Sequence, residues 1–281
     1  MSASTKLKTR LIPCLLLKNG LIIRSEKFKY HQIIGDPITQ LGRYNSWLAD
    51  EVVYLDITRE GDYDVRRDDA KIATQNKRTI LEIIEEISKV SFMPLTFGGR
   101  IRTTDDIRDR LRSGADKVTI NTAAVERPNF IAESARVFGS QCIIVSIDVL
   151  RHPNGSCEVF THGGKQATGL DPVRWAAEAA RVGAGEIFLN SIDRDGTASG
   201  YDIELVASVS DAVPIPVIAC GGAGSFEHFV DVIEKGHASA ASAANLFHFT
   251  EFSYKNAKKH MQKVGMNVRS PYAETVAAGR Q

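Results

Sequence analysis

The sequence predicts an α/β fold of the (β/α)8 TIM-barrel class, built from two similar half-barrels. Eight short apolar runs are each followed by a stretch with helical features, and strands that are apolar throughout are typical of a parallel sheet covered on both faces. Eight such units in about 260 residues match the size of this barrel. The segment 49–61 also aligns with 183–196, which is a repeat at about half the chain length. A doubly wound open sheet is the alternative, but the half-length repeat favours closure.

The expected strands are short apolar segments that end at polar residues or at turn signals. They are 10–17, 51–56, 94–97, 117–120, 142–147, 186–190, 216–220 and 239–244. We expect a single barrel domain in 1–281, with the barrel over about 10–264 and a loose tail at 265–281. The basic segment 18–35 and the charged segment 60–73 are expected to be loops, and 158–161 to belong to a small hairpin.

The expected helices are marked by capping residues and by periodic apolar residues. Asp36 followed by Pro37 predicts a helix start, and Asp171 followed by a proline predicts another. Thr104 is the expected cap of a helix whose first turn holds two aspartates. Four isoleucines between 80 and 87 recur at helical spacing. The remaining helices are expected near 129–137, 202–209, 225–234 and 251–264.

Composition and charge narrow the class of protein. A net charge of +1 gives no reason to expect nucleic acid or a membrane surface as a partner. No apolar run reaches the roughly 18 residues of a membrane-spanning helix, and the polar segment 1–8 does not resemble a secretory signal. The four cysteines form no CxxC pair, which favours reduced, buried thiols in a cytoplasmic protein over disulfides or a metal site. We expect no cofactor. The cysteines are Cys14, Cys142, Cys157 and Cys220.

Functional groups of such a barrel lie at the carboxyl ends of its strands. Asp148 ends an apolar strand there, and we interpret it as a general acid or base, with a structural cap as the alternative. Glycine pairs follow strands three and seven, at equivalent places in the two halves, and glycine lets backbone N–H groups approach a phosphate. The alternative is that each pair only makes a tight turn. The candidate phosphate-binding residues are Gly99, Arg100, Asn121, Thr122, Asp195, Gly196, Gly221, Gly222, Ala244 and Asn245.

Four charged residues lie at the opposite ends of the strands. Arg10, Glu51, Lys117 and Glu186 begin strands one, two, four and six. Two basic and two acidic side chains could form a closed ring of ion pairs across this face. The alternative is four unrelated solvated charges, since residues on this face of a barrel usually serve stability.

Several long motifs cover nearly the whole chain: RLIPCLLLKNG, VVYLDI, GADKVTINTAAV, FGSQCIIVSID, THGGKQATGLD, GAGEIFLNSIDRDGTASGYD, PVIACGGAG and NLFHF. Together they resemble the cyclase subunit of imidazole glycerol phosphate synthase. The resemblance implies a barrel with two phosphate sites, and a glutaminase subunit that docks on the N-terminal face and makes ammonia. The ammonia crosses the barrel. Two aspartates on strands one and five then form imidazole glycerol phosphate and aminoimidazole carboxamide ribotide.

The resemblance assigns roles to the candidate residues. Asp148 falls on the catalytic aspartate of strand five, and the four charges at the strand starts fall on the gate for ammonia. A phosphorylated small molecule is the expected ligand at the other end. The phosphate-site positions are matched by Asn121, Asp195, Gly196 and Gly222, with Ala244 and Asn245 near one of them.

The departures from the family pattern concern the catalytic end. Leu16 stands where the strand-one aspartate is expected, and loss of acid/base catalysis typically costs about 10²–10⁴-fold in rate. Arg100 replaces a glycine, which crowds one phosphate although its guanidinium can bind an anion. Asn190 and Cys220 replace a threonine and a serine, and the loop 60–73 is longer than usual.

Three hypotheses follow from this pattern. The first is a paralogue that conducts ammonia from a glutaminase to another acceptor; a resembling subfamily works beside sugar amidotransferases of bacterial surface-polysaccharide biosynthesis. The second is a working cyclase of histidine biosynthesis, in which another group replaces the lost acid. The third is a non-catalytic scaffold for the glutaminase.

Overall fold

The computed structural model describes residues 7–58, 63, 77, 79–249 and 253–272, and in them a closed parallel β-barrel. Each barrel strand pairs with the next in parallel, and the last strand pairs with the first, so the predicted barrel is confirmed and the open sheet is excluded. The barrel strands are β1 (Arg10–Lys18), β4 (Val52–Asp56), β5 (Leu95–Gly98), β6 (Lys117–Ile120), β7 (Ile143–Arg151), β10 (Glu186–Ser191), β11 (Val217–Cys220) and β12 (Ala240–Ala243).

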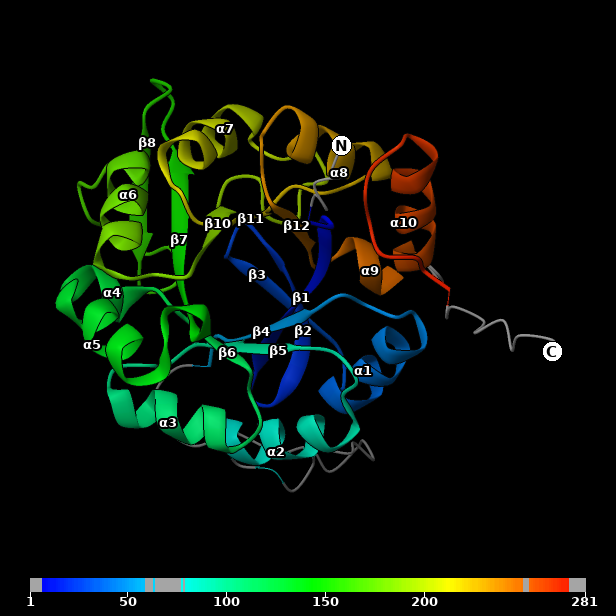
Figure 1. Ribbon diagram of the computed structural model, residues 1–281, viewed down its shortest axis with the longest axis horizontal. Coiled ribbons are helices and arrows are strands. Elements are labelled where there is room, and N and C mark those ends of the chain that lie inside the picture. The colour runs from blue at the N-terminus through cyan, green and yellow to red at the C-terminus, as the bar shows by residue number, and fades with distance from the viewer. Residues whose placement is uncertain (1–6, 59–62, 64–76, 78, 250–252, 273–281) are drawn as a thin grey trace, which may run out of the picture.

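Helices surround the barrel as an outer ring (Figure 1). They are α1 (Pro37–Ser46), α2 (Ile80–Val90), α3 (Thr104–Arg112), α5 (Asn129–Phe138), α6 (Pro172–Val182), α7 (Ile203–Ala212), α8 (Phe226–Glu234) and α10 (Ser253–Lys263). The short helices α4 (Thr122–Glu126) and α9 (Leu246–Phe249) were not predicted. The ring runs clockwise from α1 to α10 in this view. Because β–α–β crossovers are right-handed, the viewer faces the N-terminal ends of the strands.

Most helix starts follow the predicted capping chemistry. The carboxylates of Asp36 and Asp171 accept hydrogen bonds from backbone N–H groups in the first turns of α1 and α6, and Pro37 is the first residue of α1. The cap of α3 is Thr103 and not Thr104, because the Thr103 hydroxyl accepts from Asp106 N while the Asp106 carboxylate accepts from Thr103 N. This reciprocal arrangement satisfies two helix-end donors at once, so it fixes the start one residue earlier than expected.

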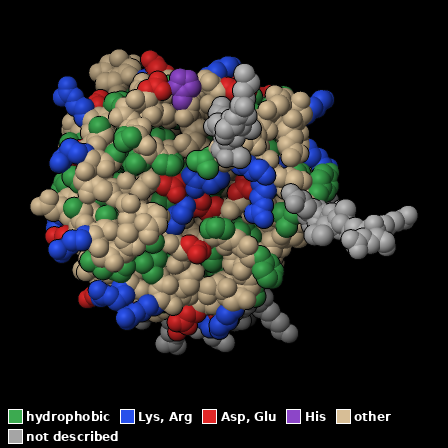
Figure 2. Space-filling model, in the orientation of Figure 1, with side chains coloured by type: hydrophobic (Ala, Val, Ile, Leu, Met, Phe, Trp, Pro, Cys, Tyr) green, Lys and Arg blue, Asp and Glu red, His purple; other side chains and the backbone are tan. Residues whose placement is uncertain are grey.

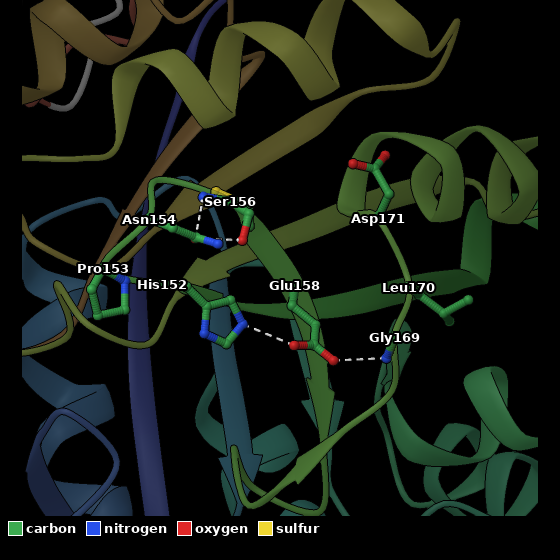
Figure 3. Close-up of a pocket in the computed structure, with 9 residues that line it drawn as sticks. His152, Pro153, Asn154, Ser156, Glu158, Gly169, Leu170 and Asp171 are labelled. Atoms are coloured by element: carbon green, nitrogen blue, oxygen red, sulfur yellow. Dashed lines mark hydrogen bonds and ion pairs between the residues drawn. The ribbon is translucent and has the colours of Figure 1, made fainter.

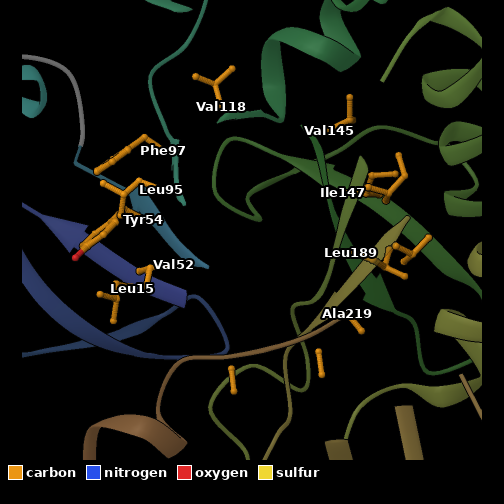
Figure 4. Packing of buried hydrophobic residues seen from close by; sticks show 14 of the residues in the cluster. Leu15, Val52, Tyr54, Leu95, Phe97, Val118, Val145, Ile147, Leu189 and Ala219 are labelled. Atoms are coloured by element: carbon orange, nitrogen blue, oxygen red, sulfur yellow. The ribbon is translucent and has the colours of Figure 1, made fainter. Parts of the chain in front are cut away.

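The strands bury two separate sets of side chains, because alternate residues point to opposite faces. Outward residues such as Leu15, Tyr54 and Phe97 pack under the helices in one large cluster (Figure 4). The rings of Tyr54 and Phe97 stack with their centroids 4.9 Å apart. The other set forms a smaller cluster that includes Ile12, Cys14, Val53, Ile144, Phe188, Ile218, Cys220 and Ala240, with Leu16, Leu55 and Ala244 packed against it. This second cluster fills the barrel interior together with the buried hydroxyl residues Thr119, Ser146 and Ser242.

The prediction of a loop at 18–35 is wrong, because this segment forms an antiparallel hairpin. Strand β2 (Leu21–Glu26) pairs with β1 and with β3 (Tyr30–Gly35). The tight turn between them places Lys27 and Phe28 at φ of 51° and 58°, and Lys29 N donates to Glu26 O at 3.0 Å. Such turns usually carry asparagine and glycine, and their absence hid the hairpin.

A second hairpin, which the sequence predicts, follows Asp148. Strand β7 continues to Arg151 and pairs antiparallel with β8 (Cys157–Thr161), which pairs with the short β9 (Gln166–Ala167). Cys142, expected as the start of strand five, lies instead in a 3-10 turn, η1 (Ser140–Cys142). At the other end of the chain Thr9 N donates to Asn267 O at 2.8 Å, which ties the start of the predicted tail to the N-terminus. The segment 60–73 falls outside the described residues except for Tyr63. No helix in the described part of the chain is long and apolar enough to cross a membrane.

Candidate functional site

The four charges at the strand starts form a closed ring of ion pairs. Arg10 Nη1 lies 2.8 Å from Glu51 Oε2, and Arg10 Nη2 lies 2.6 Å from Glu186 Oε2. Lys117 Nζ lies 2.6 Å from Glu186 Oε1 and 3.3 Å from Glu51 Oε2. The hydroxyl of Thr96 also donates to Glu51 Oε1 at 2.8 Å. Each cation therefore bridges both carboxylates, and the ring spans four strands.

The ring holds its charges in a partly buried place. The Glu51 side chain is 2 % exposed and that of Arg10 25 %. Burial alone would raise the pKa of Glu186, but hydrogen bonds and charges from Arg10 and Lys117 outweigh it and hold that pKa below its usual value. Acidic and basic side chains gather at the middle of this face, with hydrophobic side chains around them (Figure 2). Because the charges are paired, the ring forms a compact polar layer that covers this end of the barrel interior.

At the opposite end of the barrel, Asp148 is a buried carboxyl group on β7. It is 7 % exposed, and Asn121 Nδ2 donates to its Oδ2 at 2.7 Å. Burial raises the pKa of Asp148 to about 7, helped by the negative charge of Asp195 and opposed by hydrogen bonds from Asn190 and Asn121. A carboxyl group with this pKa is present in both protonation states at neutral pH, which suits a general acid or base.

The expected second acid is replaced by an apolar side chain. Leu16 lies on β1 in register with Leu55 of β4, and both pack against the apolar cluster of the interior. A leucine neither donates nor accepts a proton. This end of the barrel therefore has a carboxyl group on β7 and hydrocarbon at the position on β1 where a second acid was expected.

In the candidate anion site after β5, Arg100 stands where the family pattern has a glycine. This residue adopts φ of 58°, and its Nη1 lies 3.9 Å from Oδ2 of Asp56, a carboxylate whose side chain is 0 % exposed. Tyr63 donates to the same oxygen at 3.0 Å. Next to it, Gly99 has no room for a side chain, because a Cβ would lie 2.0 Å from Asp56 O. The Arg100 guanidinium thus already has a carboxylate partner.

The candidate residues after β10 and β12 contact the β2–β3 hairpin. The carboxylate of Asp195 accepts from Ser25 Oγ at 2.7 Å and from Phe28 N at 3.3 Å. Asn245 Nδ2 donates to Ser25 O at 2.9 Å, and a Cβ on Gly196 would lie 2.3 Å from that same carbonyl oxygen. These three residues therefore anchor the hairpin over this half of the barrel end.

The remaining candidates lie around the same end. Gly221 and Gly222 have φ of 94° and 101°, and a Cβ on Gly222 would lie 2.1 Å from Gly200 O. The backbone packing alone thus requires glycine here, which supports the tight-turn alternative without excluding an anion. Thr122 Oγ1 accepts from His162 N at 3.1 Å, and Ala244 packs against the interior cluster.

The cysteines differ in part from the prediction of buried thiols. All four are free, and Cys14 and Cys220 are buried. Cys142 and Cys157 are half-exposed instead, because they lie in a 3-10 turn and on the β7–β8 hairpin rather than inside the barrel. In the interior the neighbouring Cys220 thiol, together with burial, raises the pKa of Cys14.

A surface hollow of about 690 Å³ lies away from these residues, on the β7–β8 hairpin and the segment leading to α6 (Figure 3). His152 Nε2 lies 2.8 Å from Glu158 Oε2, and Glu158 Oε1 accepts from Gly169 N at 2.7 Å. The hollow shares no residue with the candidate site. Its polar groups already pair with one another, so it adds nothing to the chemistry at Asp148.

Sequence reasoning missed Ser25 and Tyr63 as neighbours of the site. Ser25 is fixed by the unexpected hairpin, and Tyr63 belongs to a segment read as a loop. No sequence signal marks either residue, because each meets its partner only through the folded chain.

The fold and site define a (β/α)8 barrel with a polar closure at one end and a titratable carboxyl group at the other. The family model described as Histidine biosynthesis protein matches residues 10–253. The chain belongs to this family, and the match spans the barrel from the start of β1 to the start of α10.

Proposed function

We propose that this family member receives ammonia from a partner glutaminase at the N-terminal face and delivers it to an acceptor at the other end of the barrel. The acceptor is a sugar that is amidated in surface-polysaccharide biosynthesis, and a sugar amidotransferase is the expected third component. The observation that carries the proposal is the contrast between the two ends. The four-membered ion-pair ring is complete, while Leu16 removes one of the two acids that cyclase chemistry needs.

The surface around the ring supports a docking role. Large hydrophobic side chains are exposed at the N-terminal ends of strands or the C-terminal ends of helices: Leu7 at 91 %, Val90 at 42 %, Phe92 at 91 %, Val137 at 51 % and Val264 at 48 %. All five belong to the face that carries the ring, because the strand starts and the helix C-termini of such a barrel share one face. Exposed apolar side chains of this kind mark protein interfaces when they gather on one face.

The interior supports passage of a neutral molecule. Between the ring and Asp148 the interior is lined by apolar side chains, by thiols and by the uncharged hydroxyl groups of Thr119, Ser146 and Ser242. Burying an unpaired ammonium ion there would be costly, whereas ammonia carries no charge. Ammonia therefore crosses as the neutral base, with small movements of the packed side chains.

A second candidate function is the cyclase reaction of histidine biosynthesis. It is favoured by Asp148, whose pKa of about 7 suits proton transfer. Turnover of ammonia with the aminoimidazole carboxamide intermediate decides between the two. Turnover typical of a two-aspartate cyclase would refute the delivery proposal. If Leu16→Asp raises a low rate by about 10²-fold or more, the missing acid is the reason for that low rate.

The delivery itself is tested with a candidate glutaminase and glutamine labelled with ¹⁵N at the amide. Label should reach the product in preference to unlabelled ammonium in solution. Lys117→Ala should make transfer leaky or blocked while glutaminase binding persists, and Lys259→Ala, at an exposed position within α10, is the matched control. Unchanged labelling in Lys117→Ala would show that the ring is not a gate. The hypothesis of a non-catalytic scaffold for the glutaminase would then be the one left.

A further inference from the structure

Strand β3 (Tyr30–Gly35) forms an exposed edge of the sheet. In the described part of the chain it pairs with β2 on one side and with no strand on the other. Tyr30 is 72 % exposed and Ile33 is 43 % exposed. The unpaired N–H and C=O groups along such an edge form a template to which another strand can add.

The hairpin is held in place over the catalytic end of the barrel. Lys27 N donates to Asp195 O at 2.9 Å, and Ser25 Oγ donates to the carboxylate of Asp195 at 2.7 Å. These bonds join the hairpin, which follows β1, to the segment after β10. In projection, β2 and β3 cross the centre of the barrel (Figure 1). The edge of β3 is therefore presented in a fixed position beside the end where Asp148 lies.

The hairpin that carries this edge has a net positive charge. The segment 18–35 carries Lys18, Arg24, Lys27 and Lys29 against a single acid, Glu26. Burial lowers the pKa of His31, and the positive charges of Lys18 and Lys165 lower it further, so cations crowd this part of the hairpin. A strand with acidic side chains would relieve this repulsion.

The same charges disfavour pairing between two copies of the chain. Lysines beside an exposed edge are a common device against self-association, and two copies of this net-positive hairpin would repel each other. An acidic strand from another protein meets the opposite sign. Charge complementarity thus selects a foreign acidic strand over a second copy.

We propose that β3 is the docking edge for the enzyme that accepts ammonia, which adds an acidic β-strand alongside it. Main-chain hydrogen bonds would supply affinity, and the lysines would supply specificity. The identity of the partner rests on the proposed function. The strand addition does not, because it depends only on the edge and its charges.

The test uses the whole chain and two blocked hexapeptides, one alternating valine with glutamate and the other valine with lysine. Hydrogen–deuterium exchange is followed across the hairpin. The acidic peptide should slow exchange of the amides of 30–35 in a saturable manner, and raising the salt concentration to about 0.5 M should weaken the effect. The lysine peptide should not protect them.

Charge reversal distinguishes binding that depends on the lysines from non-specific association of the peptides. Lys27→Glu/Lys29→Glu should weaken binding of the acidic peptide by about tenfold or more and allow binding of the lysine peptide. Lys259→Glu/Lys263→Glu on α10 makes the same change in net charge and should leave both results as in the natural chain. Equal binding of the two peptides, protection outside 30–35, or protection of 30–35 in a dimer without peptide would each overturn the proposal. A failed ammonia-transfer assay would refute the proposed function and leave this result standing.

Discussion

Asp148→Asn tests whether the buried carboxyl group at the barrel end is as perturbed as its surroundings imply. The side chain is 7 % exposed, and burial raises its pKa to about 7. An asparagine keeps the shape, and its amide oxygen can still accept the hydrogen bond from Asn121. The substitution therefore removes the titration with little change in packing.

The expected magnitude follows from the difference between the folded and unfolded pKa values. An aspartate in the unfolded chain has a pKa of about 3.9, so the folded group binds its proton about three pH units more tightly, which corresponds to at most about 4 kcal/mol. Below about pH 4 both states are protonated and the group costs nothing. Between about pH 4 and 7 only the unfolded state ionises, so the stability of the natural chain falls as pH rises, and above about pH 7 the cost is constant.

Urea unfolding of the natural chain and Asp148→Asn, compared at each pH from 4 to 8.5, measures this contribution. The variant should gain stability relative to the natural chain as pH rises, by about 2 to 4 kcal/mol, and the gain should level off above about pH 7. Glu133→Gln on the surface of α5 is the control and should show no such gain. A difference that does not vary with pH, or that grows toward acid pH, would refute the raised pKa.

Three further predictions concern the ring, a glycine and the hairpin. Lys117→Ala should destabilise the fold by up to about 3 kcal/mol in urea unfolding, because two carboxylates would then share one cation. Gly222→Ala should cost clearly more than Gly155→Ala in thermal unfolding, since both glycines have positive φ but a methyl group at Gly155 meets nothing within 4 Å. Ser25→Ala should cost about 1 to 2 kcal/mol and speed hydrogen exchange in β2, and unchanged exchange would show that this hydroxyl does not anchor the hairpin.

The barrel could be predicted because its signals are local and repeat along the chain. Each apolar run is long enough for one buried strand, and the helix starts carry caps such as Asp36 and Asp171. The hairpin at 18–35 could not be recognised because Lys27 and Phe28 adopt positive φ only under the pairing of the two strands, and neither residue favours that conformation alone.

The site was predictable to the extent that barrel topology dictates it. Strand starts share one face, so the sequence could place four charges there and leave open whether they pair or stay separately solvated, and they pair. The direction of a long side chain is not fixed by topology. Arg100 Nη1 lies 3.9 Å from the buried Asp56 carboxylate, and this neighbour becomes visible only when the strands are placed side by side.

The interior, Asp148 and Leu16 together restrict the chemistry that the proposed ammonia delivery could serve. On the proposed function, an interior without charged side chains favours neutral ammonia, which would act as a base on reaching Asp148. At a pKa of about 7 the Asp148 carboxyl group can take the proton that an amine adduct loses, or give one to a leaving oxygen. A reaction that needs both steps at once needs a second group, and Leu16 does not provide one. If the chain delivers ammonia as proposed, we therefore expect the second acid or base to come from the acceptor enzyme, and the edge of β3 is where that enzyme would approach.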